Sequence, residues 1–133
     1  MENLKLHHIG VATKNIEKEF TYFKMLGYER CSEIFVDEIQ KIKGIFIEAK
    51  NQPCLELLEN LTEEGPLKNY LSKGNKFYHF AYETQNIEAD YHRLINKGAI
   101  PMVKITKATF FEKICFLMLK NMMLIELVQL KEG

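Results

Sequence analysis

An internal repeat constrains this chain more than any other feature. Residues 8–17 and 79–88 share His, Thr, Asn, Ile and Glu at a fixed offset of 71 positions (79 − 8 = 71), and several of the remaining positions are apolar in both copies. Gly27 and Gly98 have the same offset. Because an internal repeat defines the architecture of a chain that carries it, the sequence predicts two related modules.

A second pair of matching segments closes the two halves. Residues 55–59 read Leu-Glu-Leu-Leu-Glu, and residues 125–129 read Ile-Glu-Leu-Val-Gln. Each half therefore opens with a histidine, His8 or His79, and ends with a glutamate, Glu56 or Glu126, at nearly the same distance (56 − 8 = 48; 126 − 79 = 47). The repeat thus includes residue types that bind metals and move protons.

Length and composition fit one compact α+β domain of 133 residues, 47% of them hydrophobic. Each half predicts the order βαβββ, and we expect a first module at 1–60, a linker at 61–75 and a second module at 76–133. Half the chain buries too little apolar area to stand alone, so the two sheets are expected to pack against each other or join edge to edge. Strands are predicted at 5–12, 28–36, 39–49, 54–59, 77–84, 100–106, 112–119 and 122–129. Two helices are predicted to start near Ile16 and Asn86, and a short one has Pro66 in its first turn.

The first predicted helix ends at Gly27 and carries an apolar stripe of Ile16, Phe20, Phe23 and Met25–Leu26. The second carries Ile87, Tyr91, Leu94 and Ile95.

Charge and cysteine content narrow the function classes. Lys plus Arg and Asp plus Glu number 18 each, so no basic excess favours a nucleic-acid partner. The longest apolar run is far shorter than the ~20 residues that cross a membrane, and Met1 leads into a charged segment, so we expect a cytoplasmic protein. The three cysteines, Cys31, Cys54 and Cys115, show no metal or disulfide spacing and are expected to be reduced and buried.

The two glutamates lie in unusually apolar strands. Residues alternate between the faces of a strand, so Glu56 points away from Leu55 and Leu57, and Glu126 has the same context. A carboxylate near a core is costly unless it is paired or coordinated. Because this cost occurs twice, together with two equivalent histidines, we expect all four side chains to converge on a metal ion. Two imidazoles and two carboxylates suit Ni, Co, Mn, Fe or Zn better than Ca.

The other histidines and the aromatic residues need separate interpretation. His7 competes with His8 for the first ligand position, but the repeat aligns His79 with His8. His92 lies on the second predicted helix and is expected to be exposed. Phe46, Phe77 and Phe110–Phe111 could line a binding cup, although phenylalanines in strands more often belong to a core.

These segments resemble a known family. Residues 6–12 (Leu-His-His-Ile-Gly-Val-Ala), residues 78–83 and residues 124–128 are similar to the vicinal oxygen chelate superfamily, which includes glyoxalase I, methylmalonyl-CoA epimerase, extradiol dioxygenases and the fosfomycin and bleomycin resistance proteins. The resemblance implies paired βαβββ modules that form a cupped, barrel-like mixed sheet around a divalent metal. The ligands it implies are His8, Glu56, His79 and Glu126.

Within the superfamily, the complete His-Glu-His-Glu set is most similar to glyoxalase I (lactoylglutathione lyase) of the nickel- or cobalt-preferring kind, with Zn and Mn as other metals. Asn60 matches a residue that contacts glutathione in those enzymes, whereas Ala12 replaces an arginine. The linker at 65–71 looks more like methylmalonyl-CoA epimerase, which often has Gln where Glu56 stands. Epimerase is therefore the alternative.

Both resemblances imply the same chemistry. A metal-bound substrate carbonyl acidifies the neighbouring C–H, and a carboxylate, Glu126 with Glu56 opposite it, removes the proton to give a metal-bound enediolate. The expected substrate is a thiol hemithioacetal or an acyl-CoA. A non-catalytic small-molecule-binding protein of the resistance type is a second alternative. Exposed strand edges predict a homodimer.

Overall fold

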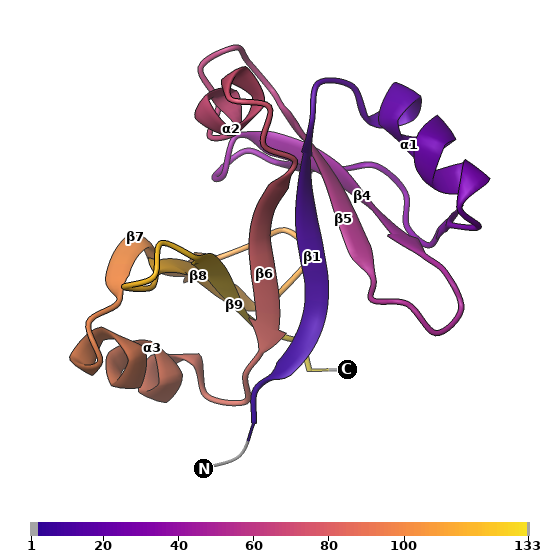
Figure 1. The fold of residues 1–133 in the computed structure, drawn as a ribbon. Coiled ribbons are helices and arrows are strands. Elements are labelled where there is room, and N and C mark those ends of the chain that lie inside the picture. Colours follow the sequence, from indigo (N-terminus) through magenta and orange to yellow (C-terminus); the bar gives the residue numbers. More distant parts are fainter. Residues whose placement is uncertain (1–2, 133) are drawn as a thin grey trace. The chain divides into compact units, whose positions relative to one another are not determined.

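The computed structural model describes residues 3–132 and divides them into two compact units. One unit is residues 8–78, and the other combines residues 3–7 with residues 79–132. The elements in chain order are β1 (Lys5–Thr13), α1 (Ile16–Met25), β2 (Glu29–Arg30), β3 (Phe35–Asp37), β4 (Ile42–Glu48), β5 (Leu55–Asn60), α2 (Lys68–Ser72), β6 (Phe77–Glu83), α3 (Ile87–Asn96), β7 (Ile100–Lys107), β8 (Lys113–Met118) and β9 (Leu124–Gln129). Figure 1 labels all of these elements except the short β2 and β3.

In the 8–78 unit the strands follow the order β2-β4-β5-β1, and β3 also pairs with β4. β1 and β5 are parallel, and the other pairs are antiparallel. α1 covers one face, where Ile16, Phe20 and Phe23 pack on a cluster from β1, β4 and β5 that includes Val11 and Leu57. The opposite face of these strands carries His8 and Glu56.

The other unit repeats this plan with the order β6-β9-β8-β7. β6 and β9 are parallel, and β9, β8 and β7 are antiparallel in turn. α3 packs through Ile87, Tyr91, Leu94 and Ile95, so its predicted stripe is confirmed. Leu4, from before β1, packs on the same cluster. The α+β class is therefore confirmed. The second unit has the predicted βαβββ order, and the first follows it except that its strand after α1 is divided into β2 and β3.

α1 and α3 each begin after an asparagine that occupies the same position in the sequence repeat. Asn15 Oδ1 accepts the backbone N–H of Lys18, and Asn86 Oδ1 accepts that of Ala89. These bonds satisfy one of the N–H groups that the first helical turn leaves without an intrahelical partner. Gly27 and Gly98 follow the helices with φ of 98° and 102°, a conformation that favours glycine and so stops the helix at the same place in each module.

Two predicted details of the first module are wrong. Residues 28–36 form two short strands, because the Ser32 hydroxyl accepts the N–H of Phe46 at 2.8 Å in place of a backbone carbonyl. Met25 and Leu26 are 80% and 71% exposed. Met25 lies nine residues after Ile16, which at ~100° per residue places it on the opposite side of the helix.

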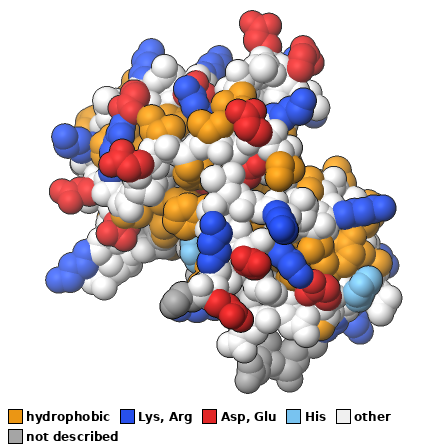
Figure 2. Space-filling model, turned by 180° about the vertical axis from the view of Figure 1, so that it is seen from behind, with side chains coloured by type: hydrophobic (Ala, Val, Ile, Leu, Met, Phe, Trp, Pro, Cys, Tyr) orange, Lys and Arg blue, Asp and Glu red, His pale blue; other side chains and the backbone are white. Residues whose placement is uncertain are grey.

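The surface and the cysteines complete the description. Figure 2 shows acidic and basic side chains interspersed over the face it presents. In residues 3–132, no helix is both long and apolar enough to span a membrane. All three cysteines are free thiols, but only Cys115 is buried, so the expectation of burial is wrong for the exposed Cys31 and the half-buried Cys54.

Candidate metal centre

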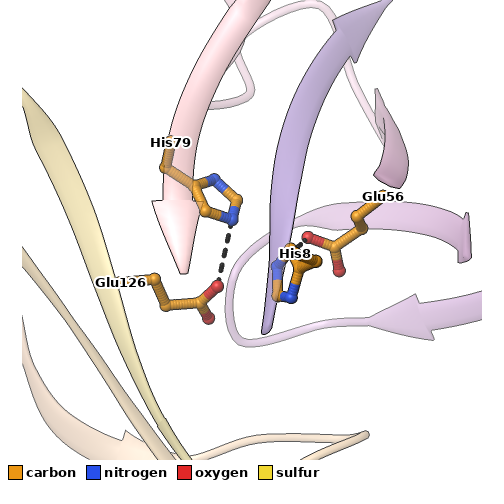
Figure 3. A group of neighbouring side chains, drawn as sticks. All are labelled: His8, Glu56, His79 and Glu126. Carbon is orange, nitrogen blue, oxygen red and sulfur yellow. Dashed lines mark ion pairs between the residues drawn. The ribbon is translucent and has the colours of Figure 1, made fainter. Parts of the chain in front are cut away.

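The first half of the candidate site is a buried His–Glu pair in the 8–78 unit. His8 Nε2 lies 3.0 Å from Glu56 Oε1, as Figure 3 shows. His8 is fully buried and Glu56 is 6% exposed. The pair forms because β1 and β5 are parallel neighbours in which Gly10 stands opposite Glu56. His8 and Gly10 share a face, and the missing side chain at Gly10 leaves room for the carboxylate to reach the imidazole.

The second half repeats this geometry in the other unit. His79 Nε2 lies 3.0 Å from Glu126 Oε1, with exposed fractions of 3% and 6% (Figure 3). Here β6 and β9 are the parallel neighbours, and the small residue opposite Glu126 is Ala81. The sequence repeat is therefore a repeat of a buried acid and its imidazole partner.

An aromatic ring lies beside each histidine; sequence reasoning named Phe46 as a possible lining residue but missed Phe116. Phe46 on β4 stands opposite Glu56, and its ring meets that of His8 edge-on, with centroids 5.2 Å apart and an interplanar angle of 77°. Phe116 on β8 does the same for Glu126 and His79, at 5.1 Å and 87°. A signal was present in the sequence, since each phenylalanine precedes its glutamate by ten residues (56 − 46 = 10; 126 − 116 = 10).

Other predicted residues lie elsewhere. Asn60 Oδ1 accepts the backbone N–H of Leu67 at 3.1 Å, so the amide anchors the linker. His7 is half-buried and packs edge-on against Phe111. His92 is exposed, as expected, and Phe77 is 71% exposed.

The donor set fits a divalent metal ion. Among residues 3–132, the side chains that could serve as metal ligands are His8 and Glu56 in one unit and His79 and Glu126 in the other. Nitrogen and oxygen donors of this kind suit first-row transition metals and zinc. A dication would also offset the negative charge of the two buried carboxylates.

Cysteine does not compete for this role. Burial raises the pKa of the Cys115 thiol to about 12, and the Glu126 carboxylate adds to the rise. Burial likewise raises the pKa of the Cys54 thiol to about 12. These two thiols therefore stay protonated at neutral pH, and the candidate ligands among residues 3–132 include no cysteine.

A family model confirms the resemblance that the repeat predicted. Residues 7–116 match the Glyoxalase/Bleomycin resistance protein/Dioxygenase superfamily. The chain belongs to this superfamily. The matched range contains His8, Glu56 and His79, whereas Glu126 lies beyond it. A search of curated proteins finds no match.

Solved structures of similar fold include methylmalonyl-CoA epimerases. Hypothetical protein BH1468 from Bacillus halodurans C-125 has a TM-score of 0.86 and 25% identity, covering 99% of this chain and 98% of that one. A Streptomyces coelicolor methylmalonyl-CoA epimerase variant in complex with 2-nitronate-propionyl-CoA has a TM-score of 0.82 and 23% identity, covering 98% and 100%. Methylmalonyl-CoA epimerase from Mycobacterium tuberculosis has a TM-score of 0.84 and 20% identity, covering 99% of this chain and 94% of that one. The likeness shows that this chain shares their fold.

Proposed function

We propose that this chain is a metal-dependent enzyme that moves a proton on the carbon next to a thioester carbonyl, as an acyl-CoA epimerase does. The observation that carries the proposal is the repeated buried His–Glu pair, which gives each module one carboxylate and one imidazole. A lone buried pair is compatible with a structural role. Two pairs at equivalent positions, with matching exposure and distance, favour a shared chemical purpose.

The two pairs are proposed to hold one divalent ion through His8, Glu56, His79 and Glu126. When bound, the ion would act as a Lewis acid on a carbonyl oxygen of the substrate. The chain's own contribution is to hold the imidazoles still. Phe46 and Phe116 pack edge-on against the two rings, and the neighbouring β-strands fix their backbones.

The carboxylates are the proposed proton carriers. Epimerisation removes a proton from one face of a carbon and returns it to the other face, which suits two bases of similar basicity. Glu126 is the proposed first base and Glu56 the second. Both are buried, so water has little access to a proton in transfer.

Epimerase chemistry is favoured over glyoxalase I by the structural neighbours and by the linker. Glutathione recognition would draw on Asn60 and on an arginine where Ala12 stands. Here Ala12 is fully buried in a cluster with Leu58 and Leu67, and the Asn60 oxygen is bonded to Leu67. Both positions are therefore used to seat the linker.

Glyoxalase I remains the second candidate because of one residue. Glu56 occupies a ligand position where epimerases often have glutamine, and Glu at both positions is typical of glyoxalase I. The two reactions share proton abstraction next to a carbonyl, so the substrate decides between them.

The test starts from chelated protein reconstituted with Ni, Co, Zn or Mn. We expect one ion per chain by elemental analysis and metal-dependent exchange of the C2 proton of methylmalonyl-CoA in D₂O by NMR. Glu126→Gln and Glu56→Gln should each abolish exchange, whereas the exposed control Glu38→Gln should not.

Thioester formation from methylglyoxal and a thiol, without C2 exchange, would establish glyoxalase I instead. If the chelated protein takes up no ion from any of the four metals, both catalytic candidates fail. The non-catalytic binding protein would then be the remaining function.

A further inference from the structure

Each module contains a second polar side chain, three residues after its ligand glutamate, that reaches the helix. Glu59 Oε1 accepts the backbone N–H of Ile16 at 2.9 Å, across 43 residues. Gln129 Oε1 accepts that of Ile87 at 3.0 Å, across 42 residues. Ile16 and Ile87 are the first residues of α1 and α3. The same tie between strand and helix is therefore built twice.

The tie acts on the strand from the side opposite the ligand. Residues three apart in a strand face opposite sides, so Glu56 lies on the ligand face while Glu59 lies on the helix face. The first N–H of a helix has no intrahelical partner, and the strand supplies one. Because Ile16 and Ile87 are almost fully buried, water cannot replace this acceptor.

We propose that Glu59 and Gln129 are positioning residues for the metal centre. Each ties its ligand strand, β5 or β9, to the helix of the same module and so fixes where the ligand carboxylate stands. The inference rests on the proposed function. It adds two residues outside the ligand set whose substitution should change the metal affinity.

The accepting side chain is charged in the first module and neutral in the second. Glu59 Oε2 also lies 3.4 Å from Lys43 Nζ. In the second module the equivalent lysine, Lys113, pairs with Glu88 in the first turn of α3 at 2.6 Å, and the acceptor Gln129 is neutral. The modules share the hydrogen-bonding oxygen and differ in its charge, so the oxygen is the part that matters.

The experiment compares Glu59→Ala and Gln129→Ala with Glu59→Gln, which copies the acceptor of the second module, and with the exposed control Glu38→Ala. Co affinity is measured by competition with a chromophoric chelator, the Co absorption spectrum is recorded, and apo stability is measured by urea unfolding. We expect both Ala variants of the tie to weaken Co binding about tenfold, as partners outside a ligand set do, and to change the spectrum. Glu59→Gln should bind like wild type.

A purely structural role predicts a different result. If Glu59→Ala and Gln129→Ala lose apo stability but keep the Co affinity and spectrum, the inference is wrong. It is also wrong if Glu59→Gln binds Co as weakly as Glu59→Ala does. Glu59→Gln and Gln129→Glu keep the test open should the Ala variants fail to fold.

Failure of the proposed function is a separate outcome. If wild type takes up no ion, the tie is judged on the apo protein through the imidazole NMR signals of His8 and His79. These signals should shift in the Ala variant of the same module and stay in place in Glu59→Gln. Unchanged signals in both Ala variants would overturn the inference.

Discussion

Replacement of the two aromatic rings beside the histidines offers a matched test of the site. Phe46→Leu and Phe116→Leu keep an apolar side chain but remove the ring that meets His8 or His79 edge-on at 5.2 or 5.1 Å. An aromatic pair of this kind contributes about 0.5–1.5 kcal/mol beyond its buried area. If that energy holds the imidazole in its binding orientation, metal affinity should fall roughly 2- to 13-fold, since about 1.4 kcal/mol corresponds to tenfold.

The assay is competition for Co with a chromophoric chelator at constant pH, with apo stability measured separately by urea unfolding. Because the two ring contacts are so similar, we expect losses of similar size in the two variants. Phe77→Leu, which changes a 71% exposed ring, is the control and should bind Co like wild type. Unchanged affinity in both variants, or a loss confined to one module, would refute the idea that the rings orient equivalent ligands.

Two further predictions concern stability. Leu67 is fully buried against Ala12 and Leu58, so Leu67→Ala should lower the free energy of unfolding by about 3 kcal/mol in urea, within the range seen for buried leucines, while the exposed Leu26→Ala should change it by less than about 0.5 kcal/mol. A small loss at Leu67 would show that the linker is not part of the core. Burial raises the pKa of the Cys115 thiol from 9.0 to about 12, so between these values the folded chain keeps a proton that the unfolded chain has lost. The contribution of Cys115 is therefore complete below pH 9 and is lost as the pH rises towards 12. Cys115→Ala should reduce the decline in unfolding free energy measured between about pH 8 and 10.5 under reducing conditions, and an equally steep decline in the variant would contradict this assignment.

The repeat and the alternation of strand residues together predict which side chains lie next to one another. The repeat selects His8 over His7, and alternation places Glu56 on the face opposite Leu55 and Leu57. The structure agrees, with His8 and Glu56 paired and His7 packed against Phe111. Both signals depend only on spacing along the chain, which one sequence contains in full.

The details that could not be predicted depend on pairing between distant residues. The strand is interrupted after Arg30 because the Ser32 hydroxyl accepts a hydrogen bond from the N–H of Phe46. No local sequence pattern predicts that bond. Asn60 is polar and lies four residues after Glu56, so the sequence suggests that it contacts a substrate. In the structure its side-chain oxygen accepts a hydrogen bond from the backbone N–H of Leu67. Phe46 was among the candidate lining residues, yet its place beside His8 follows only from the β4–β5 register.

The two units differ in whether they are built from one continuous segment of the chain, and this affects the order in which they fold. Residues 8–78 form one unit from a continuous segment, whereas the other unit needs residues 3–7 together with residues 79–132. Leu4 packs into the core of that second unit, and Lys5 Nζ lies 3.7 Å from Glu83 Oε2. On a ribosome the continuous unit can complete its core while later residues are still being made. The segment at 3–7 must wait for partners more than 70 residues away, and such distant contacts form slowly. During translation, residues 8–78 should therefore fold first, and residues 3–7 should stay unpacked until β9 has been synthesised.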